Sequence, residues 1–346
     1  MAYTTIDDPS AYFQTVLYTG NATNSTAITN TGNSDLQPDW LWIKNRSSSG
    51  GVGPHFIVDS SRGANKDFHM NNDEAEHTTT NAVKSFNSDG FTIDDGGTVN
   101  NNTDNYVAWQ WKCNGGTTSS NTDGSVTTTI QVNQTLGFSI VLWTANGTTS
   151  GTIGHGLGAT PTVIIEKYRS ATSDWSYFTN TGGNKLLFLN KTDAATTSFS
   201  GINSVGSSTF TDGNSGTETR IAYCFTPIQG YSKYGIYEGN NNSNGPFIYL
   251  GFEPALFIVK NVDSTAAWRL YSNKISNQNG FNDLDRVFYP NTNEAESGTG
   301  HAVDFLSNGI KIRGDNEDVN DADTYTYMAF AEHPFVSSEG VPCTAR

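Results

Sequence analysis

The chain has 346 residues, of which 35% are hydrophobic, 12% aromatic and only 15% charged. This composition is rich in Asn, Thr, Ser and Gly, and it excludes long helices, coiled coils and helical repeats, which are built from Ala, Glu, Lys and Leu. The formal net charge of −15 excludes the basic surface that binding to nucleic acid or to anionic membranes requires.

The chain opens on a segment, residues 1–11, that we expect to form an arm. It begins MAYTTIDDPS and has neither the basic start nor the apolar stretch of a secretory signal. The longest apolar runs, such as Ala255–Val259, are far shorter than the roughly 20 residues that span a bilayer. We therefore expect synthesis in the cytoplasm of a host cell and no membrane insertion.

Three related units follow, at residues 12–116, 134–233 and 234–340. In each unit an aromatic strand end runs into a Gly/Asn turn, a strand that begins with proline places lysine six residues later, and a closing strand carries alanine directly before an aromatic residue. The proline strands are Pro38–Asn45, Pro161–Tyr168 and Pro254–Asn261, and the closing strands are Tyr106–Trp111, Arg220–Phe225 and Tyr327–Glu332. Residues 117–133 are expected to be a linker or a peripheral hairpin, and residues 341–346 a C-terminal arm.

Short runs of Val, Ile, Phe, Tyr, Trp and Thr, bounded by Gly, Asn, Asp and Ser, predict strands throughout these units. The sequence therefore predicts an all-β fold of tandem antiparallel β-sandwich domains, jelly-roll-like, as three internal repeats. The alternative is two larger sandwiches with one unit split between them. The Glu-Ala-Glu segments within residues 73–77 and 293–297 predict one turn of helix, capped by Asp73 or Asn293.

Trp40 and Trp42 share one face of the first proline strand, where a pair of exposed indoles could stack on a sugar. The corresponding residues of the other units are all apolar, namely Val163 and Ile165, then Leu256 and Ile258. This face is therefore predicted to be core.

Two further sets of residues are predicted to lie near the surface. The recurring lysines are expected at sheet edges with their ammonium groups in solvent; they are Lys44, Lys167 and Lys260. The repeat comparison constrains three other tryptophans less, and they are expected to be able to reach a surface; they are Trp143, Trp175 and Trp268.

Residue types with catalytic or metal chemistry form no recognisable pattern. The two glutamate pairs, Glu74/Glu76 and Glu294/Glu296, have a spacing at which helical residues do not face each other. The acidic stretch Asp315–Asp323 offers oxygen ligands for calcium but lacks the glycine and terminal glutamate of an EF-hand loop. The six histidines are scattered, and three widely spaced cysteines predict free thiols: Cys113, Cys224 and Cys343. We expect no enzymatic activity and no cofactor, with calcium in an acidic loop as the one metal to consider.

Taken together, these segments resemble an uncharacterised, internally repeated β-rich domain of virion and tail-fibre-like proteins of marine bacteriophages. The residues that carry the resemblance are Pro38–Asn45, Ser85–Ile93, Tyr106–Lys112, Gly137–Thr144, Gly154–Gly158, Pro254–Asn261 and Tyr327–Glu332. It covers residues 12–340, and the second unit departs from it by lacking the Ser-Asp-Gly-Phe and Glu-Ala-Glu segments. The resemblance implies a part of a virus particle and carries no catalytic motif.

The resemblance and the composition together predict a non-enzymatic virion protein, a tail fibre, spike or appendage that attaches to the host surface. The alternative is an architectural protein that decorates a capsid or joins tail parts. The expected partners are other virion proteins and a host cell-surface glycan or protein, and a homotrimer is expected by analogy with phage fibres. Because loops carry recognition, the candidate receptor contacts are loop residues: Ser48, Ser49, Thr149, Thr172, Asn240, Asn241 and Asn242.

Overall fold

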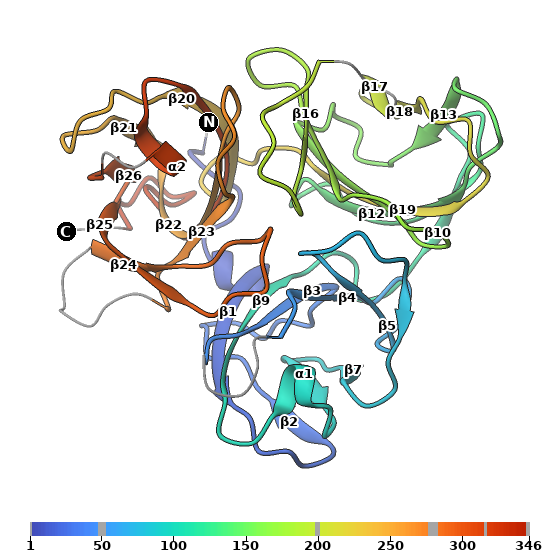
Figure 1. Cartoon of the computed structure of the whole chain (residues 1–346), viewed down its shortest axis with the longest axis horizontal. Coiled ribbons are helices and arrows are strands. Elements are labelled where there is room, and N and C mark those ends of the chain that lie inside the picture. The colour runs from blue at the N-terminus through green and yellow to red at the C-terminus, as the bar shows by residue number, and fades with distance from the viewer. Residues whose placement is uncertain (1, 48–52, 198–200, 276–282, 315–316, 344–346) are drawn as a thin grey trace.

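The computed structural model describes residues 2–47, 53–197, 201–275, 283–314 and 317–343. Antiparallel sheets make up nearly all of its regular structure, which confirms the predicted all-β, sandwich-type fold. No helix of the described chain has the length and apolar character needed to cross a membrane. Figure 1 shows three two-sheet sandwiches arranged around a common centre.

The first sandwich pairs a six-stranded sheet with a three-stranded one. In spatial order the large sheet contains β1 (Phe13–Thr19), β9 (Asn105–Trp111), β3 (Trp40–Asn45), β4 (Phe56–Asp59), β5 (Lys66–His69) and β6 (His77–Thr78). The small sheet contains β2 (Thr26–Ile28), β8 (Phe91–Ile93) and β7 (Val83–Phe86), and the short helices are η1 (Pro9–Ala11) and α1 (Gly97–Asn100).

The second sandwich has a seven-stranded sheet, whose edge is formed by the segment expected to be a linker or a hairpin. In spatial order its strands are β10 (Ser119–Asn121), β11 (Thr128–Asn133), β12 (Phe138–Thr144), β19 (Thr219–Phe225), β14 (Val163–Tyr168), β15 (Ser176–Thr179) and β16 (Lys185–Phe188). Its small sheet contains β13 (Gly151–Gly154), β18 (Thr209–Asp212) and β17 (Ile202–Val205).

The third sandwich pairs two four-stranded sheets. One contains β20 (Ser232–Glu238), β27 (Thr324–Pro334), β22 (Phe252–Asn261) and β23 (Arg269–Ser272). The other contains β21 (Phe247–Tyr249), β26 (Gly309–Ile312), β25 (Ser297–Leu306) and β24 (Asp283–Val287), and α2 (Glu317–Asn320) precedes β27.

The proline strands are buried on both faces, which explains why they are apolar without alternation. In β3, Leu41 and Ile43 point into the core of the first sandwich, whereas Trp40 and Trp42 point out of it into a second core. This second core, which we call the central core, is the largest apolar cluster of the described residues, and strands of all three sandwiches line it. The prediction that the Trp40 face is core is confirmed, and this core lies between the sandwiches.

The sandwiches form a closed ring of contacts, each made by residues at the end of a proline strand or directly after it. Lys44 Nζ of the first sandwich donates to Asn293 O of the third at 3.1 Å, and Lys167 Nζ of the second donates to Asp73 O of the first at 3.2 Å. Ala195 N of the second sandwich donates to the carbonyl oxygen of Val262, in the third, at 2.8 Å. Contacts at the matching ends of the three proline strands, repeated head to tail around a closed ring, relate the sandwiches by approximate threefold rotation.

A second series of contacts repeats around the same ring at the start of the next strand. Trp175 Nε1 donates to His69 O at 3.1 Å, and Trp268 Nε1 donates to Phe188 O at 2.8 Å. In the first sandwich His55 takes this place, with Nε2 lying 3.1 Å from Tyr289 O. Burial lowers the pKa of His55 well below its ordinary value, so the ring is neutral and reaches Tyr289 as a neutral donor.

Three expectations from the sequence, two about exposed side chains and one about a helical turn, are wrong. Trp143, Trp175 and Trp268 are at most 4% exposed, because two close the contacts between sandwiches and Trp143 lies in the core of the second. Lys44, Lys167 and Lys260 are fully buried, because their ammonium groups are surrounded by carbonyl oxygens. The Glu-Ala-Glu segments are not helical, because backbone groups of residues 73–76 bond to the second sandwich instead.

The buried lysines predict how stability depends on pH. Burial lowers the pKa of Lys44 to about 7, and those of Lys167 and Lys260 to about 8. Unfolded lysine titrates at about 10.4, so above pH 7 these three lysines bind more protons in the unfolded chain than in the folded chain, which makes stability rise with pH. Burial raises the pKa of Glu166 to about 7, which opposes this rise near pH 7 and fades above it. The unfolding temperature is therefore expected to rise between about pH 7 and 8, where most unfolded cysteine and tyrosine are still protonated.

The control for this prediction is Lys44→Met, which removes the titrating group and keeps most of the packed side chain. Scanning fluorimetry of both proteins across this range is expected to show a shallower rise for the variant. A wild-type unfolding temperature that is flat or falls with pH would show that the three ammonium groups stay charged without penalty.

Candidate functional site

The candidate contact loops follow the two strands that flank the closing strand of each sandwich, and the register places both kinds of loop at the same end of that sheet. In the third sandwich, Glu238 at the end of β20 pairs with Thr324, and Asn261 at the end of β22 pairs with Tyr325. The other sandwiches pair in the same way, through Thr19 with Asn105, Asn45 with Tyr106, Thr144 with Thr219 and Tyr168 with Arg220. Each sandwich therefore presents both loops together.

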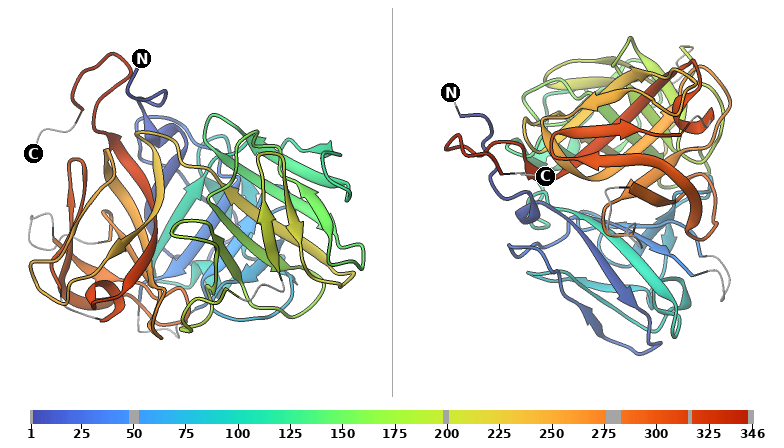
Figure 2. Two further views of the ribbon diagram at one scale, coloured as in Figure 1. Left: turned by 90° about the horizontal axis from the view of Figure 1, so that it is seen from above. Right: turned by 90° about the vertical axis from the view of Figure 1, so that its left-hand side faces the viewer.

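Because the sandwiches are related by rotation around one centre, these loop pairs lie on the same side of the ring. We call this side the loop face; its described loops are 20–25, 145–150, 169–174, 239–246 and 262–267. The two ends of the chain lie on the other side, where β1 begins and β27 ends. Figure 2 shows these ends close together, and Asp7 accepts from Ser338 N at 2.6 Å there.

The expected N-terminal arm, residues 1–11, is described from residue 2 onward, and its first part packs along the third sandwich. Tyr3 Oη donates to Gly251 O at 2.8 Å, and Thr4 Oγ1 donates to Gln229 O at 2.8 Å. Ile6 is buried in the central core.

The loop that carries Asn240, Asn241 and Asn242 is held by one buried side chain at the end of α2. The Asn320 Oδ1 atom accepts from Asn240 N at 3.0 Å, and its Nδ2 atom donates to Asn242 O at 2.7 Å. Asn241, at the tip, has a φ of 50°, a left-handed conformation that asparagine tolerates well. All three loop residues are exposed, so a rigid base presents a polar tip.

The first sandwich uses the same device, and this was missed in the sequence. The Asn100 Oδ1 atom accepts from Asn21 N at 2.8 Å, and its Nδ2 atom donates to Thr23 O at 3.0 Å. The sequence signal for this asparagine is the dipeptide Val-Asn, which residues 99–100 and 319–320 share. In both places it ends the short helix before the closing strand.

The remaining candidate residues divide into three cases. Thr149 is exposed in the 145–150 loop, where Asn146 Oδ1 accepts from Thr148 N at 3.2 Å and shapes the turn. Thr172 is exposed, but its neighbour Ser173 donates from its N–H to Asp73 O at 2.9 Å, so this loop also joins two sandwiches. Ser48 and Ser49 lie outside the described residues.

The acidic stretch considered for calcium is described only in part, since residues 315 and 316 lie outside the described residues. Asp318 accepts from Arg269 Nε at 2.8 Å, and Asp323 accepts from Asn261 Nδ2 at 2.9 Å. Asp318 therefore pairs with a cationic side chain of the chain itself, and Asp323 accepts a hydrogen bond from a neighbouring amide.

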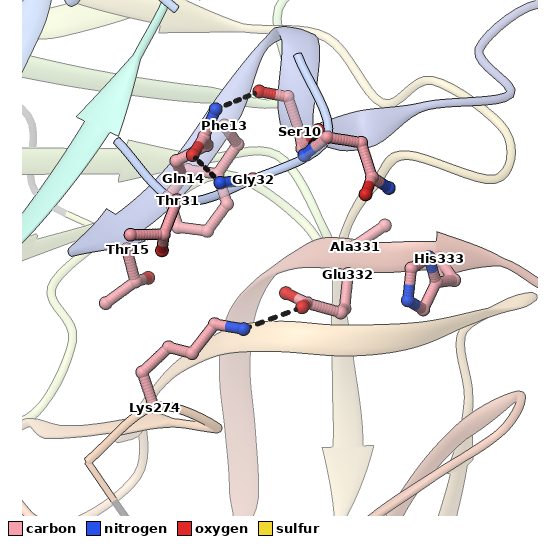
Figure 3. Close-up of a pocket in the computed structure, with 11 residues that line it drawn as sticks. Ser10, Phe13, Gln14, Thr15, Thr31, Gly32, Lys274, Ala331, Glu332 and His333 are labelled. Carbon is pink, nitrogen blue, oxygen red and sulfur yellow. Dashed lines mark hydrogen bonds and ion pairs between the residues drawn. The ribbon is translucent and has the colours of Figure 1, made fainter. Parts of the chain in front are cut away.

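A polar pocket of about 250 Å³ lies between the first and third sandwiches, on the side of the chain ends (Figure 3). Lys274 Nζ lies 2.9 Å from Glu332 Oε1 across it. Gln14 closes another wall, where its Oε1 accepts from Gly32 N at 2.8 Å and its Nε2 donates to Ser10 O at 2.8 Å. Because these polar groups satisfy one another, the pocket offers little to a ligand.

One cluster of metal-binding residue types was also missed in the sequence. Asp67, His69 and His77 each bring a ligand atom within 4.8 Å of the others. The histidines were interpreted as scattered because eight residues separate them. They meet because β5 and β6 pair directly, with Asp67 opposite His77, and only a prediction of that hairpin could have shown it.

Comparison with known proteins gives a family without an assigned activity. No curated protein matches the chain, and no solved structure does. Residues 8–334 match the model of a family described as a domain of unknown function, DUF7483. Since the match covers most of the chain, the protein belongs to this DUF7483 family.

Proposed function

We propose that this chain is a non-enzymatic structural protein of a virus particle, part of a tail fibre, spike or appendage, and that its loop face attaches to the host surface. The observation that carries the proposal is the polarity of the ring. Rigidly held Asn- and Thr-rich loops lie on one side and both chain ends on the other. Such a body suits mounting from one side and contact through the other.

The chemistry of the loops fits a polar receptor such as a glycan. Asn241 and Thr149 offer amide and hydroxyl groups, which donate and accept hydrogen bonds and suit sugar hydroxyls. The buried positions beneath them are fixed by packing, so contacts at the tips are preorganised and lose less entropy on binding. The partners proposed are a host glycan or surface protein on the loop face and other virion proteins at the opposite side.

The test is a competition experiment with the full chain and cells of the bacterium on which the encoding phage grows. Labelled protein is expected to bind saturably and to reduce adsorption of the phage. A Thr149→Ala, Thr172→Ala, Asn241→Ala variant is expected to bind about tenfold or more weakly, since these residues would touch the receptor. The matched control is Asn33→Ala, an exposed residue on the side of the chain ends.

Absence of saturable binding, with the predicted homotrimer present so that avidity is preserved, would contradict attachment. Equal binding of the loop variant and the wild type would contradict the role of the loop face. The second candidate function is an architectural one, capsid decoration or tail scaffolding. The contacts that order the N-terminal arm from residue 2 onward agree with it. It is supported if the wild-type chain binds no cell but binds other virion proteins.

A further inference from the structure

The β5–β6 hairpin of the first sandwich brings a carboxylate and two imidazoles together. Asp67 and His69 point to the same face of β5, as alternate residues of a strand do, and His77 is the cross-strand partner of Asp67. Asp67 Oδ2 lies 3.6 Å from His69 Nε2 and 3.5 Å from His77 Nδ1. The two imidazole centroids are 4.6 Å apart, so three potential ligand atoms converge.

The carboxylate at the centre of this cluster has an unusual environment. Asp67 is 0% exposed, and neither of its oxygens has a hydrogen-bond partner among the described residues. Its separations from the two imidazole nitrogens exceed those of N–H···O hydrogen bonds. A buried carboxylate without partners is costly, and a bound cation would compensate this cost.

We propose that Asp67, His69 and His77 bind a divalent first-row transition-metal ion of the Zn²⁺ type. Ligand atoms about 2.1 Å from one ion at tetrahedral angles lie about 3.4 Å from each other, close to the 3.6 and 3.5 Å that separate Asp67 Oδ2 from the two imidazole nitrogens. Two imidazoles and one carboxylate suit zinc and its neighbours, whereas calcium and magnesium prefer oxygen ligands alone. The fourth position is open to water.

Glu74 completes the arrangement from the other side of the rings. Its Oε2 atom lies 3.6 Å from His69 Nδ1 and 3.5 Å from His77 Nε2, the nitrogens that face away from Asp67. These separations also exceed those of hydrogen bonds, and a movement of a few tenths of an ångström on metal binding would let Glu74 accept from the second N–H of a bound histidine and fix its tautomer. Since the Glu74 side chain is 55% exposed, the site opens to solvent and an ion can enter it.

The position of the site gives the ion a structural consequence. The loop between β5 and β6 carries two contacts to the second sandwich, through Asp73 O to Lys167 and through Glu76 to Arg169. An ion that joins the two strands would fix both ends of this loop and therefore hold the contact between the first and second sandwiches. This role does not depend on the proposed attachment function.

The test is titration of the full chain, prepared without a histidine tag and stripped with chelator, with Zn²⁺ and separately with Co²⁺. One ion per chain is expected, with the visible absorption of nitrogen- and oxygen-ligated Co²⁺ and a higher unfolding temperature with either ion. His77→Asn is expected to weaken binding by about 100-fold or more, and Glu74→Gln by about 10- to 100-fold. The matched control His333→Asn is expected to bind as the wild type does.

Asp67→Asn separates a ligand role from a merely structural one. It removes the buried charge, so without metal the variant is expected to unfold at the same or a higher temperature than the wild type. With Zn²⁺ it is expected to lose the metal-dependent rise. The proposal is overturned if the wild type binds no stoichiometric ion, if Asp67→Asn and His77→Asn bind as tightly as the wild type, or if His333→Asn abolishes binding.

Discussion

Replacing Arg62 by methionine is expected to destabilise the folded chain by about 3–5 kcal/mol, because the change leaves a buried carboxylate without its charge partner. The Arg62 side chain is 0% exposed, and its Nε atom lies 2.5 Å from Asp59 Oδ2. The same carboxylate oxygen accepts from the Tyr223 hydroxyl of the second sandwich at 2.8 Å. The network therefore fixes the first sandwich against the second.

The pKa directions agree with a tightly paired cation. The neighbouring carboxylates, Asp59 foremost, outweigh the burial of Arg62 and raise the pKa of its guanidinium. Arg62 Nη1 also lies 3.2 Å from Glu76 Oε2, and the guanidinium lies over the ring of Phe68 at 4.2 Å. Methionine keeps the contact with this ring, so the free energy of unfolding that is lost reports the missing charge rather than the missing ring contact.

Urea unfolding at neutral pH is the measurement for Arg62→Met. The matched control is Arg169→Met, which removes a partly exposed partner of Glu76 and is expected to cost less than about 1 kcal/mol. The double variant Asp59→Asn, Arg62→Met is expected to recover part of the loss, because no unpaired charge remains. A cost below about 1 kcal/mol for Arg62→Met would contradict the account of this network.

Replacing Trp40 by alanine is expected to cost about 3–5 kcal/mol, the usual range for emptying a large aromatic site in a core. Trp40 is 1% exposed, and its ring centroid lies 4.7 Å from that of Tyr223 and 4.4 Å from that of Trp111. Because Tyr223 belongs to another sandwich, the cavity would open in the shared core and weaken more than one sandwich.

The measurement is urea unfolding followed both by fluorescence and by far-ultraviolet circular dichroism. For Trp40→Ala the two signals are expected to shift together to lower urea, because loss of the shared core destabilises the whole ring. Trp40→Phe, which keeps an aromatic ring at the site, is the control and is expected to cost clearly less. Separate transitions in the variant, with only the first sandwich destabilised, would contradict the role of the central core.

Much of the fold could be predicted from the sequence because strand patterns are local. The runs around Trp40–Asn45 and Phe252–Asn261 are short, apolar and bounded by turns, and they form strands as expected. Their lack of polar alternation is the pattern that burial on both faces produces, although only the core position of the Trp40 face was predicted. What could not be predicted is that the second face belongs to a core shared by three sandwiches, because period-two patterns do not say which sheet covers a face.

The misinterpreted lysines illustrate the same limit. Lys44, Lys167 and Lys260 recur at matching positions, and a lysine at a strand end usually extends into solvent. Here the neighbouring sandwich supplies a carbonyl oxygen to two of them, Asn293 O to Lys44 and Asp73 O to Lys167. Contacts between units depend on the relative placement of whole sandwiches, which no local pattern encodes.

The candidate site shows a similar division. The turn residues near Asn240 and Thr149 were predicted to be exposed loops from their composition, and the structure exposes them. The asparagine at residue 320 that holds one of these loops lies far away in the chain, so its role appears only in three dimensions. The cluster of Asp67, His69 and His77 likewise depends on one strand pairing.

The three sandwiches form one body around a shared aromatic core. Differential scanning calorimetry of the full chain tests this directly. A single transition is expected, in which the calorimetric and van't Hoff enthalpies agree, because the face that each sandwich turns to the shared core loses its cover once another sandwich unfolds. Two or three resolved transitions, each with the enthalpy expected for a domain of about one hundred residues, would show that the sandwiches are independent and would contradict the claim.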